Sequence, residues 1–543
     1  MAFGILEDKY LEHVPGTALL TDRGIVHGQD VNDAKELKHG TGRHSHIILI
    51  PQPTDDPREP LNWPRWKKEL CFWTLCFTAS LDGALSPMTG PAYVLLSGQF
   101  GVSVNEVTST FGSILLGLAC FMLFQGALAA KFGHRIVYLG SVTLMFISCI
   151  WCALSPNLAS IRAARVFQGF GMSALQSLVA STIEQLYFVH ERGSRSVAWS
   201  FSILAGITLG PLLYSFVVQN LTWQLGFWFV TIPLGLSIFM VFFLVPETTY
   251  RPKTVQKASD KGGIDASDST EKGSAIVIEN ASDHDVETTS VEPAPPSYRS
   301  QLTIYSGTYS DTSLWKIFLR PFPFLLSPVT WFIFLVHGMQ TVWLSLMPIC
   351  SSTIFTIEYG FDAAQIGLTN LGGIVGIVLA FIVTGPLMDY GTVWIAKRNK
   401  GIYEPEFRIF FIASMLFGLF GYAGWAVGTT HNMPWIGAVA CIAMANFSII
   451  LSTSAAVTYL LDTHGVNALH VLALSNFSKN IVLYAFTFFA NGMVEDRGVR
   501  VSLLILAAGQ AFCWLASFPM YIYGKRVRSF IARHPRLFTI GEN

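Results

Sequence analysis

Two long blocks of apolar sequence, separated by one polar stretch, constrain this chain more than any other feature. The first block runs from Leu70 to about Val245 and the second from about Pro328 to Tyr523, whereas residues 248–312 between them are rich in Ser, Thr, Asp, Glu and Pro. Each block contains several apolar runs of about 20 residues, the length at which an α-helix crosses a bilayer. A soluble fold cannot bury so many such runs, so the sequence predicts an all-α membrane protein.

The composition agrees with a surface that mostly contacts lipid. Only 13% of the 543 residues are charged, whereas soluble domains carry about 25%. Lys plus Arg and Asp plus Glu number 35 each, so the net charge does not indicate a nucleic-acid partner. The 8 Cys lie mostly inside apolar runs without a paired spacing, which predicts neither disulfides nor a metal site.

The apolar runs predict twelve transmembrane helices in two halves of six. The halves cover residues 70–246 and 328–523, with tails at 1–69 and 524–543 and a linker at 247–327. The linker has too little apolar surface to fold, so we expect it to be disordered. The predicted spans are, in order, Leu70–Val94, Val107–Ala130, Ile136–Leu154, Ile161–Ile183, Val197–Val218, Leu225–Val245, Pro328–Cys350, Ile366–Met388, Ile409–Val427, Trp435–Tyr459, Ala468–Ala490 and Val501–Tyr523.

The distribution of charge predicts the orientation of these spans. Lys and Arg gather before the first span and after the second, fourth, eighth and twelfth, and short loops with this bias lie in the cytoplasm. Both termini and the linker are therefore predicted to be cytoplasmic. Asn220 begins an Asn-Leu-Thr sequence in a loop on the external side, which makes it a candidate glycosylation site.

The two halves share a short turn with basic residues, which follows the second span and recurs after the eighth. Such repetition is typical of secondary transporters built from duplicated halves. The candidate conformational residues in these turns are Gly126, Lys131, Gly133 and Arg135 in the first copy, and Gly385 and Asp389 in the second.

A second group of conformational candidates lies on the fifth span. Gly206 and Gly210 are four residues apart, so they share one helix face and allow a neighbouring helix to approach closely. Pro211 removes a backbone hydrogen bond and can bend the span. Plain helix packing is one interpretation of this group, and a bent element in a rocking movement is the other.

These motifs resemble those of the major facilitator superfamily. The first turn is similar to its Gly-x-Leu-x-Asp-Arg-x-Gly-Arg-Arg loop, although Ala130 stands where the superfamily has Asp. Arg165-Val166-Phe167-Gln168-Gly169-Phe170-Gly171 matches its Arg-x-x-Gln-Gly-x-Gly motif, and Gly206-Ile207-Thr208-Leu209-Gly210-Pro211 matches a motif associated with proton antiporters. Other stretches resemble the fungal twelve-span drug:proton antiporter family, including its polyamine-transporter-like branch: Asp56-Pro57, Pro60-Leu61-Asn62-Trp63-Pro64, Pro246-Glu247-Thr248 and Glu404-Pro405-Glu406-Phe407-Arg408. The resemblance implies two pseudo-symmetric six-helix halves around a central cavity.

Asp82 is the main candidate for proton coupling. It lies roughly 18 Å along the first span from Leu70, at about 1.5 Å per residue, and is therefore near the bilayer midplane. A charge there costs about 2.5–3.5 kcal/mol on insertion scales, so it should face a cavity or a partner. We expect Arg165 to approach from the fourth span at comparable depth, with Gln168 and Gln176 on its face. A static ion pair between Asp82 and Arg165 and a role in coupling or substrate contact are the two interpretations.

Other polar residues inside spans are further candidates for the cavity. Lys479, with Asn480 beside it, either binds substrate or braces two helices. His337, near Gln340, is either a proton or ligand group or a satisfied packing residue. Glu184 either controls access at the cytoplasmic end of the fourth span or is an interfacial charge.

The sequence lacks a GxxxxGK[ST] nucleotide loop and the HExxH and GxSxG enzyme motifs. We therefore predict no enzyme and no cofactor, with a proton gradient as the energy source. The predicted function is export of a drug, toxin or secondary metabolite by a monomeric, proton-coupled, alternating-access transporter in the plasma membrane. Proton-coupled uptake or exchange of a cationic amine or polyamine, and a non-transporting membrane sensor, are the alternatives.

Overall fold

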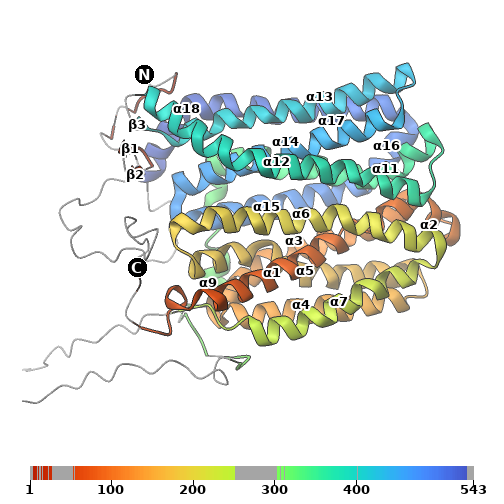
Figure 1. Ribbon diagram of the computed structural model, residues 1–543, viewed down its shortest axis with the longest axis horizontal. Coiled ribbons are helices and arrows are strands. Elements are labelled where there is room, and N and C mark those ends of the chain that lie inside the picture. The colour runs from red at the N-terminus through yellow and green to blue at the C-terminus, as the bar shows by residue number, and fades with distance from the viewer. Residues whose placement is uncertain are drawn as a thin grey trace, which may run out of the picture.

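The computed structural model describes residues 4–8, 10, 11, 14, 16–21, 24–26, 53, 56–250, 302–305, 307–310, 312–399 and 402–534. These residues form a bundle of long helices that run side by side along one axis (Figure 1). Helix α1 (Arg65–Leu85) begins and helix α18 (Ser517–Arg533) ends at the left of Figure 1. We call this the tail end of the bundle and the opposite end the far end.

The amino-terminal half is built from mostly uninterrupted helices whose starts follow local signals. Ser103 caps one helix by accepting a hydrogen bond from the Glu106 N–H, and Asn157 caps another by accepting from the Ser160 N–H. After α1, the helices of this half are α2 (Tyr93–Phe100), α3 (Val104–Phe132), α4 (His134–Leu154), α5 (Leu158–Leu186), α6 (Val189–Asn220) and α7 (Trp223–Leu244).

The carboxy-terminal half has more interruptions. Its first span changes from α10 (Pro328–Ile333) through a π-helical turn at Phe334–Gly338 into α11 (Met339–Tyr359). π-Helical turns inside longer helices are frequently found at functional sites. The remaining helices are α12 (Ala363–Arg398), a 3₁₀ segment (Pro405–Ser414) continued by α13 (Met415–Gly428), α14 (Trp435–His464), α15 (Ala468–Thr487), α16 (Ala490–Arg497), α17 (Val499–Leu515) and α18.

Within the described residues, 9 helices or joined helices are long and apolar enough to cross a membrane, and the pair α15–α16, bent by 44°, makes 10. Helices α1 and α5 have the required length of 21 and 29 residues but are not among them. Both are rich in charged and polar side chains, Asp82 and Arg165 included. The all-α membrane fold is confirmed, and the count of twelve spans stays a prediction.

The two halves contact each other through two pairs of long helices, α3 with α15 and α6 with α12 (Figure 1). Helices α3 and α12 are the second spans of their halves, and α6 and α15 are the fifth. The two contacts are therefore equivalent under exchange of the halves, as a duplicated structure requires. At the far end, the 3₁₀ turn Gly90–Ala92 also packs against α11 and α12.

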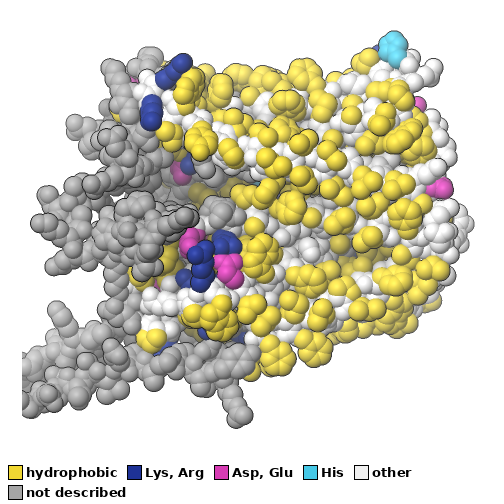
Figure 2. Space-filling view, in the orientation of Figure 1, with side chains coloured by type: hydrophobic (Ala, Val, Ile, Leu, Met, Phe, Trp, Pro, Cys, Tyr) yellow, Lys and Arg dark blue, Asp and Glu magenta, His cyan; other side chains and the backbone are white. Residues whose placement is uncertain are grey.

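Large apolar side chains cover the sides of the bundle. Leu213, Ile232, Phe239 and Phe512 are each more than 60% exposed although they lie within long helices. Figure 2 shows apolar side chains over most of one face, with Lys, Arg, Asp and Glu gathered mainly at the tail end. Such a surface suits contact with the acyl chains of a bilayer.

The linker expected to be disordered is folded at its carboxy-terminal side. Residues 251–301 lie outside the described residues, but α9 (Leu314–Leu319) and a 3₁₀ turn (Phe322–Leu326) follow them. The Tyr309 N–H donates to the Lys131 carbonyl at 2.8 Å, and Phe318 packs against Phe124 of α3. The prediction of disorder over residues 247–327 is wrong for this part because its aromatic residues pack against the amino-terminal half.

The predicted tails also form structure. Near the amino terminus, Ile5 is buried with Tyr403 and Phe407, and strand β1 (Ala18–Thr21) pairs antiparallel with β2 (Gly24–Val26) and β3 (Ile402–Tyr403). The amino-terminal tail therefore packs against the carboxy-terminal half. Helix α18 continues ten residues beyond Tyr523, to Arg533, so the carboxy-terminal tail was predicted to begin too early.

Candidate functional site

Asp82 lies at the centre of the candidate site. Its side chain is 0% exposed, and Oδ2 accepts a hydrogen bond from Gln176 Nε2 of α5 at 3.2 Å. Oδ1 has no hydrogen-bond partner among the described residues. Helix α1 directs Asp82 inward because its other face, with Ser80 and Ala84, is pressed against glycines of α6.

Lys479 faces Asp82 from the other half. It lies on α15, and the charges of Lys479 and Asp82 are close enough to interact. Lys479 and Gln176 are both half-buried in the middle of their helices, unlike the fully buried Asp82. The site therefore joins one carboxylate of the first half to one ammonium of the second.

His337 belongs to the same site. It occupies the π-helical turn between α10 and α11, and it lies within interaction distance of Lys479 and Asn476. A Cβ added to the adjacent Gly338 would lie 3.5 Å from Cβ of Lys479, which shows how closely this turn packs on α15. The structure thus brings together Asp82, Gln176, Lys479 and His337 among the predicted residues.

Gln340 and Asn480 lie nearby but are more deeply buried. The Gln340 side-chain amide donates to Ser448 at 3.0 Å and to Ser452 at 3.3 Å, both on α14. Gln340 therefore joins α11 to α14 within one half. The amide nitrogen of Asn480 has no hydrogen-bond partner among the described residues.

Arg165 is not the partner of Asp82. One guanidinium nitrogen donates to the Leu85 carbonyl at 3.0 Å and to Gln168 Oε1 at 2.9 Å, and the guanidinium lies 4.8 Å from the Phe227 ring centre. Arg165 is eleven residues from Gln176 along α5, a separation of roughly 16 Å. The expected pairing of Arg165 with Asp82 is wrong because the guanidinium instead binds the Leu85 carbonyl at the carboxy-terminal end of α1.

Glu184 lies near the tail end of α5, apart from this centre. It is half-buried, and Arg192 both donates to its backbone carbonyl at 2.8 Å and attracts its carboxylate. This local pairing agrees with the interfacial interpretation of Glu184.

Glu247, which is not among the predicted site residues, holds the turn between α3 and α4. Glu247 accepts hydrogen bonds from the backbone N–H groups of His134 at 3.0 Å and Arg135 at 3.1 Å. Gly133 has a φ of 96°, and a Cβ there would collide with the Glu247 carboxylate. The Arg135 side chain is 0% exposed and donates to carbonyls that include those of Val245 and Thr303. In the sequence, the position of an acidic residue directly after the sixth predicted span is the feature that could have indicated this contact.

The other predicted conformational residues differ in packing. A Cβ on Gly206 would collide with the Ser80 carbonyl, and one on Gly210 would lie 2.5 Å from that of Ala84. Gly126 and Gly385 have open space around them. The side chain of Asp389 lies outside the described residues. Asn220 ends α6 at an exposed position of the far end, where its glycosylation stays a prediction.

The second half has a buried cluster in the equivalent place, where the end of its last span contacts the start of its third. Arg528 of α18 pairs with Glu404 at 2.9 Å and Glu406 at 2.7 Å, and all three side chains are at most 1% exposed. Nearby, Arg408 pairs with Asp462. Burial, together with the Asp462 carboxylate, raises the pKa of Tyr403, so its hydroxyl stays protonated and donates to Asp462.

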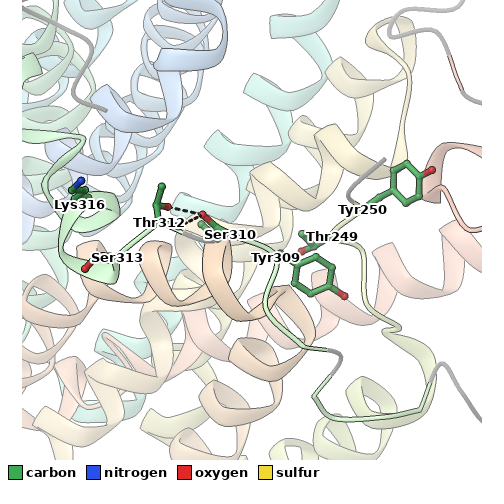
Figure 3. Close-up of a pocket in the computed structure, with 8 residues that line it drawn as sticks. Thr249, Tyr250, Tyr309, Ser310, Thr312, Ser313 and Lys316 are labelled. Atoms are coloured by element: carbon green, nitrogen blue, oxygen red, sulfur yellow. Dashed lines mark hydrogen bonds between the residues drawn. The ribbon is translucent and has the colours of Figure 1, made fainter. Parts of the chain in front are cut away.

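A separate cavity of about 570 Å³ lies at the tail end (Figure 3). Ala130, at the position where the superfamily turn has Asp, contributes to its wall. The remaining lining residues are mostly Ser, Thr and Tyr, with one Lys. The side chains of Ser310 and Thr312 are hydrogen-bonded to each other at 2.5 Å. Its lining contains none of Asp82, Gln176, Lys479 and His337. The other lining residues are Thr249, Tyr250, Tyr309, Ser310, Thr312, Ser313 and Lys316.

Several contacts join the two halves at the far end. There, the Thr108 hydroxyl donates to the Thr487 carbonyl at 3.1 Å, and the Gly492 N–H donates to Asn105 at 3.3 Å. Helices α6 and α12 are also in contact nearer the tail end, where the ring centres of Phe201 and Phe381 are 5.2 Å apart. The described helices are therefore closed together at the far end, beyond Asp82.

This architecture agrees with the comparison to known sequences. The sequence profile of the Major Facilitator Superfamily matches residues 75–482, most of both halves. The chain belongs to this superfamily. It is accordingly a multi-pass membrane transporter of small molecules, and the superfamily is generally not enzymatic.

Its relatives include fungal transporters over nearly their full length. It is 26% identical to protein HOL1 of Saccharomyces cerevisiae, with 97% of this chain and 98% of that protein covered. It is 24% identical to MFS antiporter QDR3 of Candida albicans (92% and 82% covered) and 25% identical to efflux pump radE of Floropilus chiversii (89% and 84% covered). The human organic anion transporter MFSD10 has a similar fold, with a TM-score of 0.52 at 13% identity over 84% of this chain and all of that one.

Proposed function

We propose that this protein is a proton-coupled secondary transporter that exports a small organic molecule, such as a drug, toxin or secondary metabolite, across the plasma membrane. One observation carries the proposal: a fully buried carboxylate, Asp82, interacts with Lys479 of the opposite half across the interior of the bundle. Ionisable groups inside membrane helices face cavities and mark ion or proton pathways. The relatives named as an antiporter and an efflux pump support the direction of transport.

The predicted orientation indicates which side of the membrane is closed in this conformation. If the tail end is cytoplasmic, as the basic loops predict, the contacts at Thr108 and Asn105 close the external side. We therefore propose that Asp82, which is 0% exposed in this conformation, is reached by protons from the cytoplasmic side. Separation of these contacts and approach of the two halves at the tail end would expose the same residues to the outside.

The charge pair between the halves supplies a coupling mechanism. Ionised Asp82 attracts Lys479 and so favours the arrangement in which α1 and α15 are close. Protonation of Asp82 removes this attraction and leaves the Lys479 ammonium without its counter-charge. His337 is the other titratable group that faces Lys479, and Gln176 is the neutral partner of Asp82. Proton binding therefore changes the relative stability of arrangements that differ in the distance between the halves.

The test is substrate-dependent proton movement in sealed proteoliposomes. The purified full-length chain is reconstituted with an internal pH-sensitive dye, a pH gradient is imposed, and rhodamine 110, which carries both amino groups and a carboxylate, is added as a probe. We expect accumulation of the probe in exchange for protons, and no accumulation when an ionophore removes the gradient. Gradient-independent equilibration of the probe would contradict proton coupling.

Uptake or exchange of a cationic amine remains the alternative, and the acidic side chain of Asp82 is the observation that favours it. Spermidine in the same vesicles separates the two functions. Proton-coupled movement of spermidine together with inactivity toward rhodamine 110 would replace drug export by amine transport. A sensor would bind a probe without moving it.

A further inference from the structure

The interior of the bundle has opposite electrical character on its two sides. On the side of the first half, Asp82 presents a carboxylate, and its second oxygen has no hydrogen-bond partner among the described residues. On the side of the second half, Lys479 presents an ammonium with His337 beside it. Gln176 holds only one oxygen of Asp82, so the hydrogen-bonding capacity of the other, enclosed oxygen is unused.

The other charged side chains of α5 lie away from this pair. Arg165 is bound to Leu85 and Gln168, at a distance along α5 from Gln176. Glu184 is attracted to Arg192 at the tail end. Asp82 of the first half and Lys479 of the second are therefore the opposite charges that the fold brings into interaction between the halves.

This arrangement restricts the charge of the molecule that binds there. A simple cation that takes the place of Lys479 beside Asp82 leaves the Lys479 ammonium uncompensated in a mostly apolar interior. A simple anion bound to Lys479 leaves the Asp82 carboxylate uncompensated in the same way. Removing one partner of a buried pair is strongly unfavourable because the other charge stays desolvated.

We propose, on the basis of the transport function above, that the substrate carries both a cationic amine and an anionic acceptor, such as a carboxylate. The amine binds Asp82 and the acceptor binds Lys479, so both charges are compensated while the substrate separates the pair. The polar side chains beside Lys479 then hold the acceptor end. The substrate connects the two halves, and its binding is coupled to their relative position.

Thermal stabilisation of the purified full-length chain in detergent tests this assignment without a proton gradient. The probes are ω-amino acids from glycine to 8-aminooctanoate, compared with the unbranched amine and the unbranched carboxylate of each length. We expect at least one amino acid to bind tenfold or more tightly than both of its matched single-charge analogues. A simple amine or carboxylate that binds as tightly as every amino acid would overturn the proposal.

Two variants make opposite predictions and so exclude misfolding as the explanation. Lys479→Gln should shift the preference to the amine, and Asp82→Asn should shift it to the carboxylate. Glu358→Gln, an equivalent change at an exposed far-end position, should retain the preference of the unaltered chain. Equal shifts in both interior variants would contradict the assignment. Amino acid binding without gradient-driven flux would leave the assignment standing and refute the transport function instead.

Discussion

The contact between α1 and α6 allows a quantitative prediction for the substitution Gly210→Ala. A Cβ at this position would lie 2.5 Å from the Ala84 carbonyl, whereas ordinary contacts of a Cβ begin near 3.4 Å. The two helices must therefore separate by about 0.9 Å, unless α1 rotates. Overpacking of this kind costs about 1–3 kcal/mol.

The displacement also reaches the site, because Ala84 is two residues from Asp82. The hydrogen bond from Gln176 to Asp82 is 3.2 Å long, and a shift of about 0.9 Å along it would exceed normal hydrogen-bond distances. We therefore expect Gly210→Ala to reduce both thermal stability and proton-driven transport.

The matched control is Gly126→Ala. Gly126 also lies inside a long helix, but a Cβ there would have no atom within 4 Å. Alanine favours helix over glycine by about 1 kcal/mol, so this control should be neutral or slightly stabilising. Thermal unfolding in detergent, followed by tryptophan fluorescence, measures the difference. Equal unfolding temperatures for the two variants, with unchanged transport in both, would refute the close-contact argument.

Two further predictions concern the tail end. Arg528→Gln leaves the buried Glu406 carboxylate without its ion-pair partner, while Glu404 keeps Lys525 at 2.7 Å, and it should destabilise the chain by about 3–5 kcal/mol. Arg526→Gln, at a half-buried position, should cost far less, and similar unfolding temperatures for the two variants would contradict this. Gly16→Val should release the amino-terminal segment, because Gly16 has a φ of 90° and a Cβ there would lie 2.7 Å from the Asp462 carbonyl. The control is Gly4→Val, because Gly4 has a similar φ but no atom within 4 Å of an added Cβ. Hydrogen exchange of residues 5–8 should accelerate only in the Gly16 variant. Equal exchange rates in the two variants would argue against docking of this segment.

The sequence predicts much of the fold because hydropathy and helix length are local properties. The two halves and the interior position of Asp82 follow from the spacing of apolar and charged residues. The repeated basic turn predicts the pseudo-symmetry that relates the α3–α15 contact to the α6–α12 contact.

The partner of Asp82 could not be predicted in the same way. The position of a residue along a span indicates its depth in the membrane but not which neighbouring side chain it contacts. Arg165 therefore could be placed near Asp82 in depth, although its guanidinium donates to the Leu85 carbonyl at the end of α1. Lys479 lies almost 400 residues from Asp82 in the sequence, and only the packing of the halves brings the two charges together. The folded linker segment was missed for a related reason: its aromatic residues find their partners on α3.

The central claim is that Asp82 couples protons to movement of the two halves, and the variant Asp82→Asn tests it most directly. Gradient-driven accumulation and gradient-free exchange of the same substrate are measured in parallel in proteoliposomes. The account predicts that Asp82→Asn abolishes accumulation while exchange between internal and external substrate remains detectable. Full proton-driven accumulation by Asp82→Asn would contradict it.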